Sequence, residues 1–313
     1  MPAPRHAIVL TAGLGTRLRP LTDVRAKPAM PVAGVPMVRR IVEWLAGNGV
    51  TELVLNLHHL PATLTRIVGD GADLGANIRY SWEPVVLGSA GGPKQAAAIL
   101  GASEFLLVNG DTLTDVDLRK LASAHERANA LVTLALVPNT EPLRYGGVLV
   151  DTNGDVTGFV RRGPAAAGSF HFVGVQIARE EAFRSAPAGA PSASIGGIYD
   201  ALIAAAPGSI RGFVCDASFF EVGTVADYVR ASRAFGASST GDVFCGRNPQ
   251  IASTARVTRS ILWDDVHVGA DSVVDECVVT DGVHIPDGAI YRRAAIVRLP
   301  GERGDLIVAP IAE

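Results

Sequence analysis

Residues 7–22 read Ala7-Ile-Val-Leu-Thr-Ala-Gly-Leu-Gly-Thr-Arg-Leu-Arg-Pro-Leu-Thr22. The apolar run at residues 7–11 predicts a buried β-strand, and the glycines at positions 13 and 15 follow it at once. Glycine lets a backbone approach a ligand closely, and consecutive N–H groups in such a turn form a concave site for an anion. The stretch therefore predicts a strand that delivers a phosphate-binding loop at its carboxyl end.

Positive charge is concentrated in and just after this loop. Arg17 and Arg19 offer planar, permanently charged groups to a polyphosphate, and Lys27 stands in Ala26-Lys-Pro-Ala-Met-Pro31, which its prolines stiffen. The loop lacks the third glycine of the GxGxxG pattern, because position 18 is leucine, and no Gly-Lys-Ser/Thr sequence follows. These absences exclude a nicotinamide dehydrogenase fingerprint and a Walker loop.

Outward from the loop, short apolar runs alternate with helical patterns as far as residue 235. This alternation predicts βαβ units around a Rossmann-like, mainly parallel sheet in an α/β fold. Apolar residues recur at helical spacing in residues 36–49, where Asn48-Gly49 supplies a stop, and residues 147–150 and 156–160 flank a turn cluster that favours a hairpin. The other predicted strands are residues 52–57, 105–108 and 131–136, and residues 186–197 are predicted to form a surface connection.

The C-terminal part follows a different period. Segments 251–257, 268–274 and 285–291 repeat at an interval of 17 residues, and the apolar pairs 261–262, 278–279 and 295–296 keep the same interval. A period close to three hexapeptides predicts a parallel β-helix of about three coils. We therefore predict a first domain at 1–235, a linker at 236–247 and a β-helix domain at 248–313.

Composition narrows the classes of function. The net charge is −3, which provides no general field for nucleic acid or an anionic membrane surface. The three widely separated cysteines show no metal-ligand spacing and are expected to be reduced packing residues. Neither a signal-peptide core nor a membrane-spanning run is evident, so a cytoplasmic address is expected.

Four further motifs follow the loop along the chain, at residues 87–92 (LGSAGG), 108–112 (VNGDT), 145–150 with 159–162, and 219–228 (FFEVGTVADY). Together with GLGTRLRPLT and KPAMPV, these resemble the sugar nucleotidylyltransferases, also called NDP-sugar pyrophosphorylases, and in particular mannose 1-phosphate guanylyltransferase-like members. The resemblance covers nearly the whole chain. It implies a Rossmann-like mixed-sheet nucleotidyltransferase domain followed by a short C-terminal left-handed parallel β-helix.

The reaction implied by the resemblance is in-line attack of a sugar 1-phosphate on the α-phosphate of a nucleoside triphosphate, with Mg²⁺ as cofactor. Catalysis would rest on positioning and charge neutralisation, without a covalent nucleophile. Arg17 and Lys27 would be catalytic, and Asp111 and Glu221 would bind the metal. The implied nucleotide-binding residues are Leu10, Ala12, Gly13, Gly15, Thr16, Arg17, Glu83, Gly88 and Asp111, and the implied sugar-phosphate-binding residues are Lys27, Gly146, Arg162 and Gly174.

The sequence departs from the family at two of these places. Glu221 stands where the family has aspartate, and Arg161-Arg162 stands where many members have Glu-Lys. Arg162 can replace the lysine as a phosphate clamp, but Arg161 cannot accept sugar hydroxyl protons, which points to an unusual or modified sugar.

Several alternatives stay open. Glu83 could accept two N–H groups from guanine, which favours guanylyl transfer, or one from uracil or thymine, and adenylyl, uridylyl and thymidylyl transfer are the alternatives. A non-catalytic nucleotide-sugar-binding protein is the alternative of another class, and an acyltransferase using His267 and His284 is a weaker one. We expect a homo-oligomer, a dimer or a tetramer, because the β-helix offers a surface for a second subunit.

Overall fold

The computed structural model describes residues 4–236, 242–299 and 306–311. The chain divides into two compact units, which are described separately. The first unit comprises Met1–Gly13, Ile41–His59 and Val68–Phe219, and the second comprises Leu14–Arg40, Leu60–Ile67 and Phe220–Glu313. The predicted phosphate loop is therefore divided between Gly13 and Leu14.

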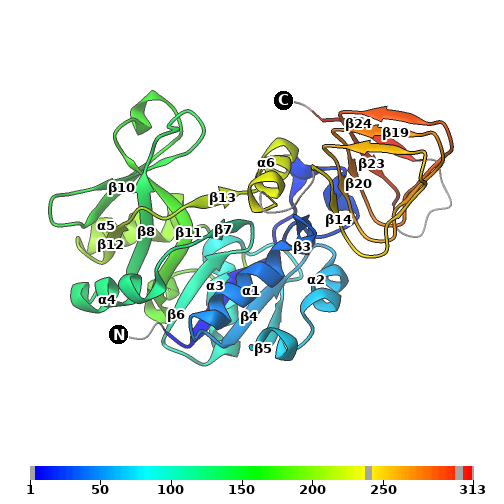
Figure 1. Cartoon of the computed structure of the whole chain (residues 1–313). Coiled ribbons are helices and arrows are strands. Elements are labelled where there is room, and N and C mark those ends of the chain that lie inside the picture. Colours follow the sequence, from blue (N-terminus) through cyan, green and yellow to red (C-terminus); the bar gives the residue numbers. More distant parts are fainter. Residues whose placement is uncertain (1–3, 237–241, 300–305, 312–313) are drawn as a thin grey trace. The chain divides into compact units, whose positions relative to one another are not determined.

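A mixed sheet forms the centre of the first unit (Figure 1). Strand β1 runs parallel to β4 on one side and to β6 on the other, β5 continues parallel beyond β4, and β11 is antiparallel to β6. The predicted hairpin of residues 147–150 and 156–160 is confirmed as β9 and β10. The strands of this sheet are β1 His6–Leu10, β4 Glu52–Leu57, β5 Asn77–Trp82, β6 Glu104–Asn109, β8 Val132–Pro138, β9 Gly147–Val150, β10 Val156–Val160, β11 Phe170–Arg179 and β12 Ile210–Val214. The short strand β7, Thr112–Thr114, lies outside it.

Helices cover both faces of this sheet. On one face, α3 (Gly88–Leu100) and α5 (Tyr199–Ala205) share a core with Ile8, Val54 and Leu107. On the other face lies α4 (Leu118–Ala128), whose His125 Nδ1 is 2.7 Å from the hydroxyl of Thr133. Thr133 is adjacent in β8 to the core residue Leu134, so its side chain points to the face opposite that core. Successive strand residues point to opposite faces, so the apolar runs seen in the sequence are buried on both sides.

The predicted helix at residues 36–49 is confirmed as α1 (Met37–Gly47), with Ile41, Val42 and Leu45 buried. The predicted surface connection at 186–197 is mostly exposed, although Ser194 near its end is buried and its backbone N–H is 2.9 Å from Ser89 Oγ.

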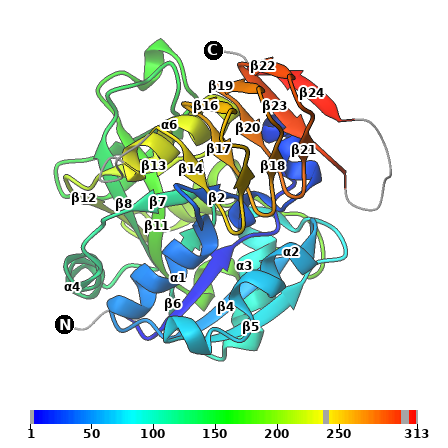
Figure 2. The ribbon, with the colours of Figure 1, turned by 45° about the vertical axis from the view of Figure 1, so that its right-hand side comes forward.

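The second unit contains the predicted β-helix, whose coils stack in register (Figure 2). Strands separated by 17 residues pair in parallel, so that Val257 lies beside Val274 and Val274 beside Tyr291. Its apolar interior includes Val266, Val283 and Ile296. The strands are β14 Phe244–Cys245, β15 Gln250–Ile251, β16 Arg256–Thr258, β17 Ile261–Leu262, β18 His267–Val268, β19 Val273–Asp275, β20 Val278–Val279, β21 His284–Ile285, β22 Ile290–Arg292, β23 Ala294–Val297 and β24 Ile307–Pro310.

The same unit contains α2 (Pro61–Val68) almost entirely, the hairpin β2 (Pro31–Val32) and β3 (Val35–Pro36), and α6 (Val225–Phe235), which follows β13 (Phe219–Glu221). Strand β14 pairs with β17, so the first coil already begins within the stretch predicted as linker, 236–247. Residues 237–241 of that stretch lie outside the described residues. The three cysteines are free thiols, and no described helix is long and apolar enough to span a membrane.

Candidate active site

In the first unit, the predicted nucleotide-binding residues follow the carboxyl ends of neighbouring parallel strands. Register pairs Leu10 at the end of β1 with Asn109 at the end of β6. Glu83 comes directly after β5, and Asp111 comes two residues after β6. Ligands of open α/β sheets bind at this edge, so the sheet places these residues where a nucleotide would be expected.

A buried network fixes the start of the glycine loop. Asn56 Oδ1 accepts hydrogen bonds from the backbone N–H groups of Thr11, at 2.6 Å, and Ala12, at 3.3 Å. Its Nδ2 donates to Glu83 Oε1 at 2.7 Å, and the hydroxyl of Thr11 donates to the carbonyl of Asn56. The network holds Thr11 and Ala12 in place immediately before Gly13, where an added Cβ would meet no protein atom within 4 Å.

Glu83 itself is fully buried, with a relative exposure of 0%. Its second oxygen, Oε2, accepts from the backbone N–H of Leu87 at 2.8 Å, so both oxygens are used within the fold. A carboxylate with no exposed surface has nothing to offer a nucleobase directly. In this arrangement Glu83 supports the turn at Leu87 and Gly88, in place of the direct base contact expected from the sequence.

The turn after Leu87 requires glycine at two places. Gly88 has a φ of 77°, and an added Cβ would lie 2.7 Å from the carbonyl oxygen of Ser192. A Cβ at Gly92 would lie 2.6 Å from Glu83 Oε1. These close approaches let the first turn of α3 pack against the Glu83 carboxylate, with the backbone of Leu87 and Gly88 beside it.

Asp111 is held beside the end of β1 by the glycine before it. The N–H of Gly110 donates to the carbonyl of Leu10 at 2.9 Å, and a Cβ at position 110 would lie only 2.5 Å from that oxygen. Asp111 Oδ1 is 3.4 Å from the Thr112 hydroxyl, and the side chain is partly exposed. Gly174, at the irregularity in β11, has a φ of 78° and lies against Asn109, since a Cβ there would be 2.8 Å from Asn109 Nδ2.

The segment predicted to bind the sugar adjoins an aromatic cluster. The ring of His171 lies 4.2 Å from that of Tyr145 and 4.8 Å from that of Phe219, measured between centroids. Burial lowers the pKa of His171 to about 4, although a hydrogen bond to the backbone of Gly146 acts in the opposite direction. At neutral pH the ring is therefore uncharged. Arg162 is exposed after β10, so it is accessible to a ligand.

In the second unit, the remainder of the loop folds back on itself. Gly15 has a φ of 62°, and its carbonyl accepts from the Thr22 hydroxyl at 3.0 Å and from the N–H of Leu18 at 2.9 Å. A Cβ at Gly15 would lie 2.8 Å from Thr22 Cγ2 and 3.3 Å from Lys27 Cβ. The side chain of Lys27 thus begins directly against Gly15, although the two residues are 12 positions apart.

Arg17 is exposed and lies beside the segment that follows β13. A Cβ at Gly223 would be 3.4 Å from both terminal nitrogens of the Arg17 guanidinium, so the Arg17 side chain lies against this glycine. The next residue, Thr224, caps α6 in a reciprocal capping box with Asp227. Glu221 is the last residue of β13 and is partly exposed, two positions before the glycine that Arg17 approaches.

The two predicted metal ligands, Asp111 and Glu221, are carboxylates, the donor type that Mg²⁺ prefers. Mg²⁺ is usually held by one or two carboxylates, with the remaining positions filled by water and substrate phosphates. Asp111 and Glu221 supply hard oxygen donors, and each is partly exposed at a strand end in its own unit. Among the described residues there is no cluster of three or more His, Cys, Asp or Glu side chains that could hold a metal.

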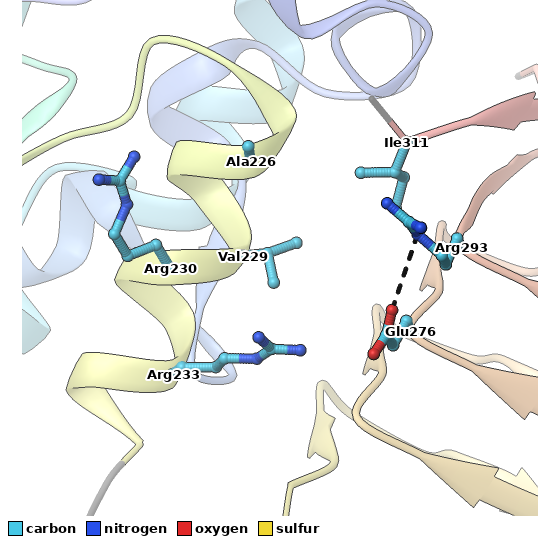
Figure 3. A pocket seen from close by; sticks show the side chains of 7 residues that line it. All are labelled: Ala226, Val229, Arg230, Arg233, Glu276, Arg293 and Ile311. Atoms are coloured by element: carbon cyan, nitrogen blue, oxygen red, sulfur yellow. Dashed lines mark ion pairs between the residues drawn. The ribbon is translucent and has the colours of Figure 1, made fainter. Parts of the chain in front are cut away.

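A hollow of about 290 Å³ in the second unit lies between α6 and the β-helix (Figure 3). Arg233 and Val229 extend into it from the helix, and Arg293 faces Glu276 across 3.9 Å on the opposite side. None of the residues predicted for the active site lines it. Its lining residues are Ala226, Val229, Arg230, Arg233, Glu276, Arg293 and Ile311.

Two groups of residues were missed by sequence reasoning. Asn56 is a polar residue inside the buried run Glu52-Leu-Val-Leu-Asn-Leu57, which was a usable signal, because a buried amide needs hydrogen-bond partners. The aromatic cluster around His171 gave no such signal, since its members come from three separate elements.

Two protein-family models match this chain. Residues 6–234 match the nucleotidyl transferase family, and residues 234–297 match the GlmU-like, C-terminal hexapeptide family. The chain is 29% identical to mannose-1-phosphate guanylyltransferase of Mycobacterium tuberculosis, over 86% of this chain and 82% of that one. It is 38% identical to N-acetylmuramate alpha-1-phosphate uridylyltransferase of Neisseria meningitidis, over 58% and 79%.

Among solved structures, HddC from Yersinia pseudotuberculosis shares the fold, with a TM-score of 0.64 and 24% identity over 74% of this chain and 99% of that one. The family match extends from the first residue of β1 nearly to the end of α6 and thus includes both parts of the glycine loop. The chain belongs to the nucleotidyl transferase family and continues into a hexapeptide-repeat β-helix.

Proposed function

We propose that this protein is a sugar-1-phosphate guanylyltransferase, which joins GMP from GTP to a sugar 1-phosphate and releases pyrophosphate. One observation carries the proposal: the loop after β1 folds back so that Lys27 begins against Gly15, with Arg17 exposed on the same loop. Such a loop offers backbone N–H groups and two basic side chains to one polyphosphate. The relative from Mycobacterium tuberculosis supports guanylyl transfer to mannose 1-phosphate as the first pair to test.

The roles proposed for the side chains follow from their charge. Arg17 binds the β- and γ-phosphates, and Lys27 neutralises the α-phosphate and the incoming sugar phosphate as negative charge accumulates between them. The backbone of Leu10, Ala12, Gly13, Gly15 and Thr16 surrounds the triphosphate, and Gly88 lies along the base. Gly146 and Gly174 lie along the sugar, whose phosphate Arg162 binds.

Asp111 and Glu221 are the residues proposed to hold Mg²⁺, which would supply charge neutralisation for both phosphate groups. Asp111 is positioned by the close approach of Gly110 to the end of β1. Glu221 has one methylene more than the aspartate usual in the family, so its carboxylate reaches further from the end of β13. Substitution of both carboxylates by amides should abolish Mg²⁺-dependent pyrophosphate release.

A second candidate is uridylyl transfer to a sugar 1-phosphate that carries a carboxylate. The relative from Neisseria meningitidis, an N-acetylmuramate alpha-1-phosphate uridylyltransferase, has the higher identity over the part it matches. Arg161 and Arg162 are both exposed after β10, and a guanidinium pairs well with a carboxylate. An acidic sugar would thus give a role to the arginine that replaces the family's glutamate.

The experiment is a pyrophosphate-release assay with purified protein, Mg²⁺, each of GTP, UTP, ATP, dTTP and CTP, and a panel of neutral and acidic sugar 1-phosphates. The highest kcat/KM is expected with GTP and a neutral sugar. Preference for UTP and an acidic sugar would replace the first candidate by the second. Nucleotide-sugar binding with no turnover on any pair would favour a non-catalytic binding protein.

The proposal includes a cytoplasmic homo-oligomer, a dimer or a tetramer. Light scattering of the purified protein at several concentrations tests the assembly, and a constant monomer mass would remove that part of the proposal.

A further inference from the structure

The second unit contains a buried ionic contact between the loop and the β-helix. Arg25, two residues before Lys27, is 8% exposed. Its Nε and Nη2 each lie 2.6 Å from an oxygen of Asp281, and Nη2 also lies 2.7 Å from Asp264. The guanidinium stands over the indole of Trp263, 5.3 Å from the ring centroid. We call this group of Arg25, Asp264 and Asp281 the arginine clamp.

The two carboxylates of the arginine clamp come from successive coils of the β-helix. Asp264 and Asp281 occupy equivalent positions in successive coils, 17 residues apart, and the backbone N–H of Asp264 lies 3.1 Å from Asp281 Oδ1. Two carboxylates so close repel each other unless a cation lies between them. Arg25 is the buried cation that meets both, and its planar fork matches one carboxylate in a bidentate contact.

Two further attachments lie on the other side of Lys27. The hydroxyl of Tyr228 donates to the carbonyl of Pro31 at 2.5 Å and accepts from Trp263 Nε1 at 2.9 Å. At the tip of the β2–β3 hairpin, a Cβ at Gly34 would lie 2.8 Å from the carbonyl oxygen of Cys245. The loop is thus attached to the rest of the second unit before and after the lysine.

Between these attachments the backbone is a single tight turn. The N–H of Ala29 donates to Ala26 at 2.8 Å, that of Met30 donates to Lys27 at 3.2 Å, and that of Ala26 donates to the Thr63 hydroxyl at 3.1 Å. A short turn fixed at both ends holds the backbone of its central residue, and therefore the point from which the Lys27 side chain extends. The backbone at Lys27 is thus held partly by Thr63 and partly by residues more than 190 positions away in the sequence.

We propose that the β-helix takes part in catalysis, because Asp264 and Asp281 act through Arg25 as positioning residues for Lys27. This inference rests on the proposed function, in which Lys27 neutralises the reacting phosphates. A displacement of about 1 Å at such a group lowers turnover strongly without preventing nucleotide binding elsewhere. The clamp should therefore affect kcat more than the KM for the nucleoside triphosphate.

The test compares Arg25→Lys and Asp281→Asn with a matched control, Arg259→Ala. Lysine keeps the charge of Arg25 but cannot form the bidentate contact. Arg259 makes similar contacts, at 2.7 Å to Asp275 and 3.0 Å to Glu276, but both partners belong to the β-helix. In both clamp variants we expect kcat to fall about 10- to 100-fold, while KM for the triphosphate changes less than about threefold. In the control Arg259→Ala we expect kcat to stay within about twofold of wild type.

A second measurement separates positioning from folding. Amide hydrogen exchange should accelerate at Ala29 and Met30 in the clamp variants, at temperatures where circular dichroism shows them folded, and should be unchanged there in Arg259→Ala. Unchanged kcat in folded clamp variants of an active enzyme would overturn the inference. If the wild-type protein is inactive across the substrate panel, the proposed function fails. Amide hydrogen exchange then tests the positioning role by itself, and an unchanged exchange rate at residues 29 and 30 in the clamp variants overturns it.

Discussion

The two parts of the glycine loop are held by different kinds of contact. In the first unit, the amide of Asn56 and the carboxylate of Glu83 fix Thr11 and Ala12 by hydrogen bonds between adjacent strands. In the second unit, a guanidinium fixes the approach to Lys27 by pairing with two carboxylates of the β-helix. Hydrogen-bonded support belongs to the part of the loop that is proposed to contact the nucleotide, and ionic support to the part that carries the positive charge.

The difference has a physical reason. The strand-end network lies within the main sheet, where a satisfied amide costs little and an unsatisfied one is destabilising. The loop carries its own cations, and a single tight turn has few backbone contacts of its own to hold it. The two regions should therefore respond differently to substitution.

The largest expected effect is the loss of turnover when Lys27, in the part of the loop held by ionic contacts, is replaced. Lys27→Ala should lower kcat about 10³-fold, because the charge that neutralises the reacting phosphates is lost. The melting temperature should change little. Pyrophosphate release measures the first and differential scanning calorimetry the second. Activity within tenfold of wild type would remove Lys27 from the proposed mechanism.

The second largest expected effect is a loss of stability when the hydrogen-bond network of Asn56 and Glu83 is broken. Asn56→Leu keeps the branched shape of the side chain but leaves Glu83 Oε1 and the N–H of Thr11 without their partners. We expect the free energy of unfolding to fall by about 4 kcal/mol, since one of the orphaned groups is a carboxylate. Urea denaturation measures it. A change below about 1 kcal/mol would mean that the network is not the main support of the loop start.

A third test uses pH, which should affect the aromatic cluster of the first unit. The pKa of His171 falls from 6.5 to about 4 on folding, chiefly because of burial, while nearby Arg144 and Glu141 act in opposite directions. The unfolded chain therefore binds a proton that the folded chain refuses. Above pH 6.5 neither state binds this proton, so the free energy of unfolding is not reduced. As the pH falls from 6.5 to 4 the free energy of unfolding decreases, by about 3 kcal/mol in total.

Unfolding at pH 7 and at pH 4.5, compared between wild type and His171→Phe, measures this contribution. The variant should lose less stability on acidification. An equal loss in both proteins would show that His171 is not the group responsible.

The smallest effect is expected from an exposed partner of the arginine clamp. Arg247 pairs with the same oxygen of Asp264 at 3.0 Å, but its side chain is 82% exposed. Arg247→Ala should cost at most about 0.5 kcal/mol, because water screens an exposed pair. Thermal unfolding of this variant beside Arg25→Lys shows whether burial separates the two arginines. A loss as large as that of Arg25→Lys would contradict the distinction.

The elements with a clear period could be predicted from sequence. The strand before Gly13, the helix at residues 37–47 and the 17-residue repeat are all confirmed, because each depends on the spacing of nearby apolar residues. The motif residues are at the expected strand ends for the same reason. Glu83 is buried and both its oxygens are used within the fold, but the binding roles assigned to the other motif residues stay predictions, as do the domain boundaries.

The supports of those residues could not be predicted. Asn56 meets Glu83 only because β4 and β5 pair in one register, and the register is not visible in either strand alone. Arg25 finds its acceptors 239 and 256 positions further along the chain. One sign was present in the sequence, since two aspartates at equivalent positions of successive coils require a cation nearby.

The contact at Gly34 has a consequence for protein engineering. A β-helix of this type looks like a separable module, because its repeat is complete in itself. Yet the carbonyl of Cys245 lies where any side chain at position 34 would begin, so the hairpin tip tolerates only glycine in this geometry. A chimera that exchanges the β-helix for that of a relative should therefore also take residues 25–36 from the same relative.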